Sequence, residues 1–557
     1  MPRRRPRQAD QGPPPTGRRH LRTRGAGGLR VAVVHPAPAG EGLASLAVHA
    51  LVALAEQAGA EAEPVFLPVR PGERPRGLLS GLPLGEFDLL AVSAAFEEQW
   101  PVLPHLLARA GLPARAAARD EGQPIVLLGG VAARLNPRPV LPFVDLLAPG
   151  DAEAVLPSLL ARLESGRGSS RAALLDSLRD LGGLGVQPFA APVQARFSSP
   201  PRPVVEHLAR GRSLLPGMRL VETGRGCPAG CRFCALGFSR RPPMFFAPAA
   251  ILEAVRAAGG GRVGLVGASL GRHPGLGELL EGLAAEGADL SPASLDPAVL
   301  AGPDGERLAA ALARGAQRTV TLAPEAGSER LRRVLGKAYT DQELEAAVRR
   351  LGEAGVIHLK LYLMFGLPTE VDEDLDAAAA LVGRVRGWLD AAHHGRGGTG
   401  RVSVSLNPFV PKPHTPFARE PMPAADELRR RRARLLASLG RAGGVQVGGL
   451  GIRRAVLQAG LTRADEGVAG LLEACQGRWP PPAGLLAGPG EVLLARAHAP
   501  WPEGLPAPWE VVACGVAPAF LAAERARALE GRPGPSCPGG DACRACGACG
   551  TGAEGVP

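Results

Sequence analysis

Lysine is nearly absent from this sequence, although the chain is basic overall. The 64 lysines and arginines include only three lysines, at positions 337, 360 and 412, and the formal net charge is +11. Because arginine replaces lysine almost throughout, the abundance of arginine says little about the partners of the protein. Charged residues make up 21% and hydrophobic residues 45% of the 557 positions, which excludes a chain that is disordered throughout.

Long hydrophobic runs are also missing. No segment reaches the roughly 18–20 apolar residues of a membrane-spanning helix, and the longest candidate, residues 43–55, is interrupted by His49. The arginine-rich start leads into proline and glycine, which is unlike a secretory signal. The 75 glycines and 56 prolines show no period, which excludes collagen. We expect a cytoplasmic protein with reduced thiols, in which clustered cysteines indicate metal ligands.

Residues 1–28 carry much of the positive charge, with eight arginines and one aspartate. This composition predicts a disordered basic tail. The same charge suits a nucleic acid or another acidic surface, so RNA stays open as a partner.

Short apolar runs alternate with helical patterns between residues 29 and 165. The alternation predicts an α/β fold with a Rossmann-like domain and a parallel sheet. Gly129, Gly130 and Gly150 follow strands, at the edge where such sheets bind ligands. Residues 166–214 form a linker rich in Ser, Gly and Pro. Strands are expected at residues 29–34, 63–67, 87–93, 124–128 and 144–148, and helices near 42–58, 98–110 and 152–165.

A second alternation, over residues 215–424, contains six strand–helix units. Eight units in about 250 residues make a complete barrel, so six predict a partial one, with its chemistry in the loops after the strands. Residues 425–532 are predicted to be mostly helical, and residues 533–557 form a cysteine-rich tail. The barrel strands are expected at residues 218–222, 263–267, 288–291, 318–323, 357–365 and 401–406, and the helices at 247–258, 275–286, 305–314, 328–335, 341–354 and 372–387.

The loop after the first barrel strand holds Cys227, Cys231 and Cys234 among three glycines. A four-iron cluster takes one thiolate for each iron, so three local cysteines leave one iron open. An open metal position can bind a substrate. A structural zinc site would need a fourth ligand nearby, and the next histidine is His273.

This cysteine pattern, with the aromatic Phe233 before its third cysteine, resembles the radical S-adenosylmethionine (SAM) superfamily. The resemblance implies a [4Fe-4S] cluster whose open iron binds SAM and whose electron cleaves it, giving a 5′-deoxyadenosyl radical that abstracts hydrogen. Several sequence segments between residues 85 and 550 resemble those of one family within that superfamily. Its members have an N-terminal cobalamin-binding-like domain and a C-terminal cysteine cluster.

The resemblance also assigns SAM contacts at later strand ends. Besides Phe233, it implies contacts from three motifs. Glu325, Gly327 and Arg330 belong to an E-x-G segment, and Gly366 belongs to a G-x-P-x-E turn. Gly267 and Ser269 stand at the place of the usual G-G-E motif. The glutamate of the G-G-E motif is replaced here by Ser269. Glu325 also suits the start of the helix that follows it.

Cobalamin is left open by the sequence. The D-x-H-x-x-G signature of a histidine-ligated corrinoid is absent, because His35 has Val33 and Pro38 at the matching positions. A Rossmann-like domain can hold a corrinoid without that ligand, or hold none.

The tail contains a second candidate metal site, at Cys537, Cys543, Cys546 and Cys549. Four thiols within thirteen positions form a closed ligand set that suits a second [4Fe-4S] cluster or a tetrahedral zinc ion. Cys475 and Cys514, in apolar surroundings, are expected to be core residues.

The scarce lysines indicate positions where a compact charge is needed, because arginine cannot replace it there. We expect Lys360 or Lys412 to face the barrel mouth and to meet an anionic substrate or SAM. His414 is a further candidate for the same mouth.

These observations predict a radical SAM enzyme that abstracts hydrogen from an unknown substrate. Methylation of that substrate is one expected outcome. SAM and a reductant such as flavodoxin or ferredoxin are the expected partners, and no membrane is involved. An RNA-modifying or sulfur-inserting enzyme and a non-enzymatic cobalamin- or cluster-binding sensor are the alternatives.

Overall fold

The computed structural model describes residues 28–208, 213–292, 294–315, 317–337, 339–393, 400–441, 444–537, 543 and 545–549. The predicted basic tail, apart from residue 28, lies outside the described residues. No helix within the described ranges is both long and apolar enough to cross a membrane.

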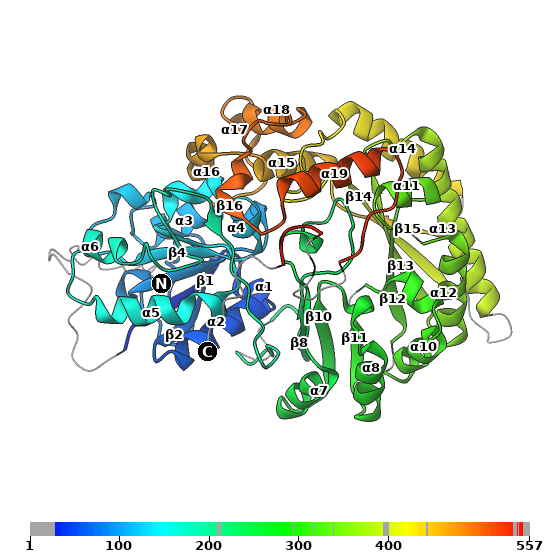
Figure 1. Ribbon diagram of the computed structural model, residues 1–557, viewed down its shortest axis with the longest axis horizontal. Helices are drawn as coiled ribbons and strands as arrows, with labels where there is room; N and C mark the ends of the chain where they lie inside the picture. The colour runs from blue at the N-terminus through cyan, green and yellow to red at the C-terminus, as the bar shows by residue number, and fades with distance from the viewer. Residues whose placement is uncertain are drawn as a thin grey trace, which may run out of the picture.

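The N-terminal part is a six-stranded sheet in the order β2-β1-β3-β4-β5-β6 (Figure 1). Its first five strands pair in parallel and β6 pairs antiparallel with β5, so this sheet reaches beyond the expected limit at residue 165. The apolar runs of the sequence become strands buried on both faces, as the helix-covered sheet requires. The strands are β1 (Arg30–His35), β2 (Glu61–Phe66), β3 (Leu89–Ser93), β4 (Ile125–Gly129), β5 (Leu146–Ala148) and β6 (Gly185–Val186), and the main helices are α2 (Leu46–Gln57), α3 (Val102–Arg109), α4 (Val131–Leu135), α5 (Leu156–Ser165) and α6 (Arg171–Asp176).

The partial barrel is confirmed. Two four-stranded sheets, β11-β10-β8-β9 and β12-β13-β14-β15, meet through a parallel bridge between Leu295 and Leu322. The six expected strands are β8 (Met218–Arg225), β10 (Arg262–Gly267), β11 (Asp289–Pro292), β12 (Thr319–Glu325), β13 (His358–Phe365) and β14 (Arg401–Pro408). The sequence did not predict the hairpin strand β9 (Met244–Phe245) or the added parallel strand β15 (Gln446–Gly448).

Helices cover the outer face of the barrel. Leu359, Leu361, Leu363 and Phe365 of β13 are buried against this layer, whereas the alternate side chains of the strand are only half-buried and face inward. The helices are α7 (Pro248–Ala257), α8 (Leu276–Ala285), α9 (Pro297–Ala301), α10 (Gly305–Arg314), α11 (Glu329–Val334), α12 (Asp341–Glu353) and α13 (Asp372–Ala392).

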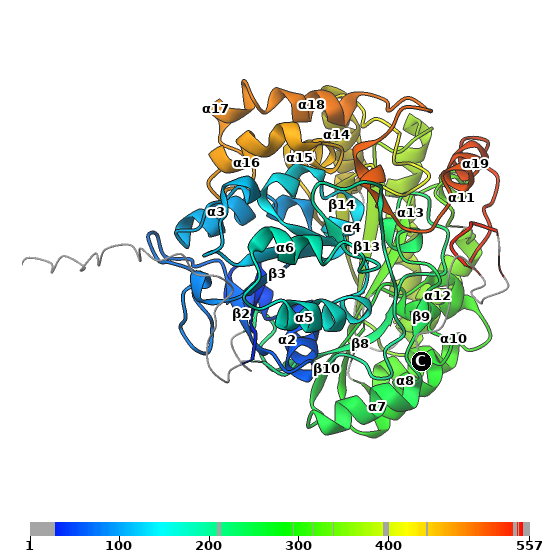
Figure 2. The same cartoon turned by 60° about the vertical axis from the view of Figure 1, so that its left-hand side comes forward.

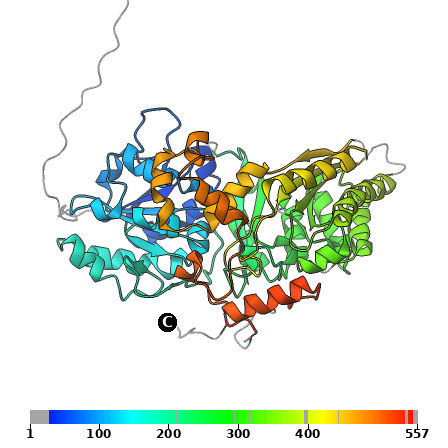
Figure 3. The ribbon, with the colours of Figure 1, turned by 90° about the horizontal axis from the view of Figure 1, so that it is seen from above.

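The C-terminal helices join the two halves instead of forming a separate body. Leu457, Leu472 and Leu493 share one hydrophobic core with strands of the N-terminal sheet. Figures 2 and 3 show these orange helices lying over the junction, and α19 running along the edge of the barrel. The elements are α14 (Ala425–Arg441), α15 (Ile452–Thr462), α16 (Ala469–Ala474), α17 (Ala483–Leu486), α18 (Glu491–His498) and α19 (Pro518–Leu529), with the short strands β7 (Val193–Gln194) and β16 (Val512–Ala513) paired in parallel.

Candidate functional site at the cysteine loop

The cysteine loop leaves the carboxyl end of β8, where a barrel carries its chemistry. Gly226 has a φ of +71°, and a side chain there would meet the carbonyl oxygen of Arg240 at 2.6 Å. Glycine is therefore required for the turn that starts the loop. Cys227, Cys231 and Cys234 follow, and all three are half-buried thiols without a disulfide.

Arg232, between the second and third cysteines, fixes the loop to three other segments. Its side chain is fully buried and donates to the carbonyl oxygens of Arg333 at 3.0 Å and Arg532 at 2.8 Å. It also forms an ion pair with Glu524 of α19 at 3.3 Å, and its backbone N–H donates to Leu335 at 2.9 Å. The loop is thus rigidly held before any cofactor binds.

Phe233 packs at the mouth of the barrel. It lies against a small cluster of buried apolar residues that includes Leu335, Leu367, Phe409 and Phe417. These residues come from the segments after α11, β13 and β14, so one apolar cluster ties the cysteine loop to three neighbouring strand ends. The cluster excludes water from one side of the loop.

A buried ion pair lies beside the thiols. The Nζ of Lys337 is 3.5 Å from Oε1 of Glu325 and donates to the carbonyl oxygen of Ala323 at 2.7 Å. The side chains of Lys337 and Glu325 are 18% and 13% exposed. Burial raises the pKa of the Glu325 carboxyl, and Lys337 opposes that effect. Burial acts to lower the pKa of Lys337, but Glu325 and the thiols raise it overall, so the ammonium form persists.

The thiols themselves are affected by burial and by each other. Burial raises the pKa of Cys231 to about 12, Lys337 acts against this rise, and Cys234 and Cys227 add to it. Burial also raises the pKa of Cys234. The three thiols lie on one loop between β8 and β9. A metal cofactor would displace their protons, since metals bind thiolates.

The donor set fits a multi-iron cluster better than a single ion. Among the described residues, no three His, Cys, Asp or Glu side chains stand close enough together to hold one metal ion. In a four-iron cluster each thiolate binds a different iron, so its sulfurs stand farther apart than the ligands of one ion. Three coupled thiols and an adjacent cation therefore suit an anionic cluster at Cys227, Cys231 and Cys234.

Gly267 and Ser269 lie at the end of β10, next to the cysteine loop. A side chain at Gly267 would meet Oγ1 of Thr223 at 2.3 Å, so a glycine lets β10 approach β8 there. Ser269 is half-buried at the start of a short 3-10 helix, Leu270–Arg272. The place of these two residues as SAM contacts stays a prediction.

Glu325 and Gly327 lie in the turn after β12. Glu325 has a φ of +64°, a strained conformation for a residue with a side chain, which commonly marks a functional site. Gly327 has a packing role, because a Cβ there would meet the backbone nitrogen of Ala378 in α13 at 2.0 Å.

Arg330 of α11 and Gly366 both contact the turn after β13. Arg330 is exposed and binds Asp374 and the carbonyl oxygen of Thr369, so its guanidinium is engaged by that turn. Gly366 has a φ of +76° and donates its N–H to Glu370 at 2.7 Å. These contacts give both residues a structural role and leave their predicted SAM contacts untested.

The two lysines expected to contact a substrate lie in different surroundings in the structure. Lys360 lies on the inner face of β13, with Nζ 5.2 Å from the centre of the Tyr362 ring. Lys412 instead donates to both oxygens of Glu97, at 2.8 and 3.0 Å, and so bridges the barrel to the N-terminal part.

His414 lines a cavity of about 760 Å³ between the segment after β14, β16 and α19. Its Nε2 is buried without a hydrogen-bond partner, and its φ is +58°. Burial lowers its pKa to about 4, so the ring is neutral near pH 7. Cys514 lines the same cavity, and Cys475 lies in the core shared by the two halves.

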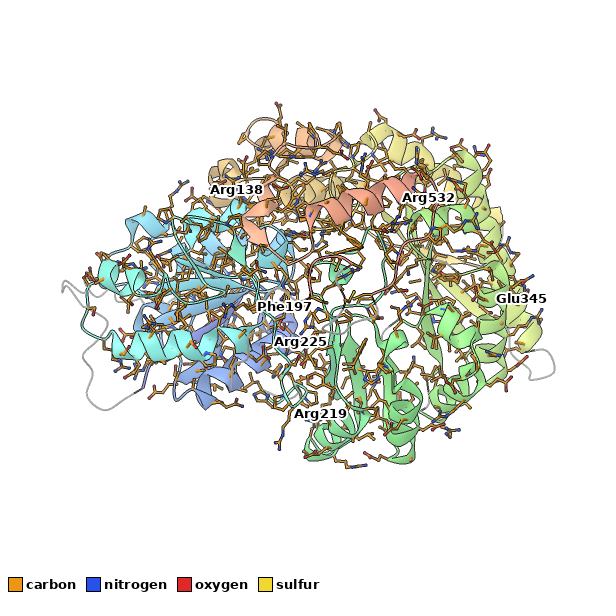
Figure 4. All side chains as sticks on the ribbon, viewed as in Figure 1. Arg138, Phe197, Arg219, Arg225, Glu345 and Arg532 are labelled. Atoms are coloured by element: carbon orange, nitrogen blue, oxygen red, sulfur yellow. The ribbon has the colours of Figure 1, made fainter. Side chains whose placement is uncertain are left out.

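A second cavity, of about 350 Å³, separates the N-terminal sheet from the cysteine loop. Gly129 and Gly150 line it from the strand ends of the sheet, and Arg225, Arg240 and Ala268 line it from the barrel. Figure 4 shows Arg225 at this boundary. This is the sheet edge at which α/β domains bind ligands.

Charged groups cross this boundary. Arg225 binds both oxygens of Glu153, at 2.8 and 3.0 Å, and Asp151 lies 3.3 Å from Arg134 and 3.3 Å from Arg240. The ion pairs hold the two halves together around the cavity.

A histidine-ligated corrinoid does not fit this cavity. His35 is buried, with Nδ1 3.0 Å from the carbonyl oxygen of Ser93 and Nε2 3.4 Å from the Gln99 amide, so both ring nitrogens are engaged. None of the described residues that line the cavity is a histidine. Its volume suits a drug-sized molecule.

The tail returns to the cysteine loop. The N–H of Cys537 donates to the carbonyl oxygen of Pro228 at 2.9 Å, and the carbonyl oxygen of Cys546 accepts from Ala517 at 2.9 Å. Cys537, Cys546 and Cys549 are buried and Cys543 is half-buried. The metal at these four cysteines stays a prediction.

Sequence reasoning missed Arg232, Lys337 and Glu97. The rarity of lysine singled out position 337 but did not show that its side chain lies next to the cysteines. A buried arginine within a loop of cysteines had no sequence signal, because arginine is abundant in this chain.

Two family models match the chain. Residues 61–186 match the model described as "Radical SAM proteins, N-terminal", and residues 221–382 match "Radical SAM superfamily". The chain carries a radical SAM domain. This domain runs from β8 into α13, with the cysteine loop inside.

One relative is similar to about half of the chain. "Uncharacterized protein MJ0966" of Methanocaldococcus jannaschii is 31% identical over 276 residues, which are 49% of this chain and 56% of that protein. The chain thus spans little more than half the length of this relative.

Two solved structures share the fold. The radical SAM methyltransferase TsrM from Kitasatospora setae, with cobalamin and a [4Fe-4S] cluster bound, has a TM-score of 0.52 at 17% identity over 72% of this chain and 78% of its own. TsrM with tryptophan and a SAM analogue has a TM-score of 0.52 at 16% identity, over 70% and 75%. The likeness extends beyond the radical SAM domain.

Proposed function

We propose that this protein cleaves SAM reductively and uses the resulting radical to remove hydrogen from a small-molecule substrate. The observation that carries the proposal is the loop of three coupled thiols at the end of β8, inside a radical SAM domain. Cys227, Cys231 and Cys234 would hold a [4Fe-4S] cluster. When bound, such a cluster supplies the electron that breaks the C5′–S bond of SAM.

The reaction balances with one electron from an external reductant such as flavodoxin or ferredoxin. SAM and one electron give methionine and the 5′-deoxyadenosyl radical. This radical takes a hydrogen atom from a substrate C–H bond, giving 5′-deoxyadenosine and a carbon-centred substrate radical, which carries the unpaired electron into the product-forming step. The chain orients the loop through Arg232 and shields it with Phe233 and its apolar neighbours. Exclusion of water protects a radical from side reactions.

The 350 Å³ cavity is the proposed substrate site. Ala268, which lines it, lies between the SAM-contact candidates Gly267 and Ser269, so a substrate there would border the SAM position. The cavity walls are mostly apolar, with Arg225 and Arg240 on the barrel side and Asp151 and Glu153 on the other. We expect a compact, largely apolar substrate with few polar groups.

The test is anaerobic reconstitution with iron and sulfide, followed by SAM and dithionite. The wild type should form 5′-deoxyadenosine and methionine in equal amounts. Cys231→Ala should form neither, whereas Cys475→Ala, which changes a buried cysteine far from the loop, should behave as wild type. Product formation by Cys231→Ala would contradict the proposal.

Corrinoid-dependent methyl transfer is the second candidate, favoured by the fold shared with cobalamin-bound TsrM across both halves of the chain. It requires the 350 Å³ cavity to open and to hold a corrinoid without a histidine ligand. Binding of hydroxocobalamin in a one-to-one ratio, followed by visible absorption, would support it. If the protein binds no hydroxocobalamin at micromolar concentration, methyl transfer is rejected and hydrogen abstraction without a corrinoid remains the proposed function.

A further inference from the structure

Lys337 is fixed against the cysteine loop by the backbone around it. It follows α11 in the segment Leu335–Gly336–Lys337, where the carbonyl oxygen of Leu335 accepts from the N–H of Arg232 at 2.9 Å. Gly336 has a φ of +75°, and a Cβ there would lie 2.5 Å from the carbonyl oxygen of Gly230 and 3.5 Å from Cα of Cys231. This close approach demands glycine and places the next residue beside the thiols.

The ammonium of Lys337 is held at one place. The carbonyl oxygen of Ala323 accepts a hydrogen bond from it at 2.7 Å, and Oε1 of Glu325, the last residue of β12, lies 3.5 Å from it. The approach of the Gly336 backbone to Gly230 and Cys231 places this ammonium and its counter-ion beside the cysteine loop.

A compact ammonium is required here. Lysine presents a point charge on a flexible stem, whereas arginine presents a wide planar fork. In a chain with only three lysines, this one sits in a largely buried position between a backbone carbonyl and the cysteine loop.

We propose that Lys337 is a positioning residue that stabilises the reduced form of the cluster held by Cys227, Cys231 and Cys234. This inference rests on the proposed function of that loop. The ammonium offsets the negative charge that a cluster gains with its electron, in a site where water screens little. Glu325 holds the ammonium in place and moderates its charge.

The experiment compares five proteins after anaerobic reconstitution: wild type, Lys337→Met, Lys337→Arg, Glu325→Gln and Tyr339→Phe. Tyr339 is the matched control, because its hydroxyl donates to the same carbonyl oxygen of Ala323 at 3.3 Å but carries no charge. Iron content is measured first, and the reduction midpoint is then measured by potentiometric titration followed by electron paramagnetic resonance, without SAM.

Lys337→Met should shift the midpoint to more negative potential, Glu325→Gln should shift it to less negative potential, and Tyr339→Phe should leave it unchanged. Lys337→Arg should lie between wild type and Lys337→Met. A general loosening of the loop would move the reduction midpoint in the same direction in both charge variants. Opposite shifts of the midpoint therefore report the charges themselves.

Three results would overturn the inference: an unshifted midpoint in Lys337→Met, shifts of the same sign in both charge variants, or loss of iron from both. A wild type that takes up no reducible cluster would instead contradict the proposed function itself.

Discussion

The two cysteine groups of this chain touch each other, yet they are held by different forces. The loop after β8 is anchored by a buried arginine, a buried Lys–Glu pair and an apolar cluster. The tail is held near it by backbone hydrogen bonds, from Cys537 to Pro228 and from Ala517 to Cys546. Spacing alone makes both groups look like metal sites, and the structure adds an ion pair beside the loop, between Lys337 and Glu325.

The largest expected effect separates the two groups directly. Cys234→Ala should lose the iron of the loop and reduce 5′-deoxyadenosine formation to background, because one of three anchoring thiolates is gone. Iron, zinc and sulfide per chain are measured together with product. Metal at the tail should remain in this variant, and its loss would mean that the two groups form one site.

Arg232 is the link between the groups, so its removal should be costly. Arg232→Met leaves Glu524 buried and frees the loop from the tail, which should reduce the free energy of unfolding by about 3 kcal/mol. The measurement is urea denaturation of the apo-protein.

The matched control is Arg527→Met. Arg527 pairs with the same Glu524 at 2.7 Å but is 42% exposed, so its loss should cost less than about 1 kcal/mol. Equal costs for the two variants would show that burial of Arg232 does not matter.

The tail should be separable from SAM cleavage. Cys546→Ser with Cys549→Ser should lose the metal predicted at the tail, because half of its ligand set is gone, and should still form 5′-deoxyadenosine. Metal analysis and product formation are measured on the same sample. Abolished product with an intact loop cluster would assign the tail a part in the reaction.

The smallest effect lies away from both cysteine groups. Burial lowers the pKa of His49 to about 4, while its bond to the carbonyl oxygen of Leu43 opposes this and His207 adds to it slightly. The unfolded chain then binds a proton that the folded chain does not, so stability is present above pH 6.5 and is lost as the pH falls toward 4.

His49→Gln should flatten this acid decline by about 1–3 kcal/mol, measured by urea denaturation between pH 4 and 7. Metal content of both cysteine groups should be the same as in wild type. A steeper decline in the variant would contradict the assignment of a neutral, buried His49.

Much of the barrel could be predicted because its signals are local. Each of the six expected strands was found within three residues of its predicted ends, since short apolar runs between helical patterns are specified by neighbouring residues. The β15 strand and the packing of α15 and α16 on the N-terminal sheet were not predicted. Their sequences are helical or glycine-broken. The β15 strand pairs with β14 across the whole of α14, and the partners of α15 and α16 in the N-terminal sheet are hundreds of positions away.

The candidate site divides in the same way. Cys227, Cys231 and Cys234 follow from spacing, because ligands to one cofactor on one loop are close in sequence. Lys360 or Lys412 was expected at the barrel mouth, and the structure pairs Lys412 with Glu97. Lys337 was noted only for its rarity, and the structure pairs it with Glu325 beside the cysteine loop. A charge finds its partner through the folded backbone, which no periodicity reveals.

The sequence by itself determined that this chain has a doubly wound domain, a partial barrel and a trio of cysteines at the first strand end, since each depends on residues a few positions apart. Tertiary structure decided which charges surround those cysteines, what closes the cavity between the two halves, and where the tail attaches. Burial and electrostatic pairing depend on distance in space, and folding sets that distance independently of position along the chain.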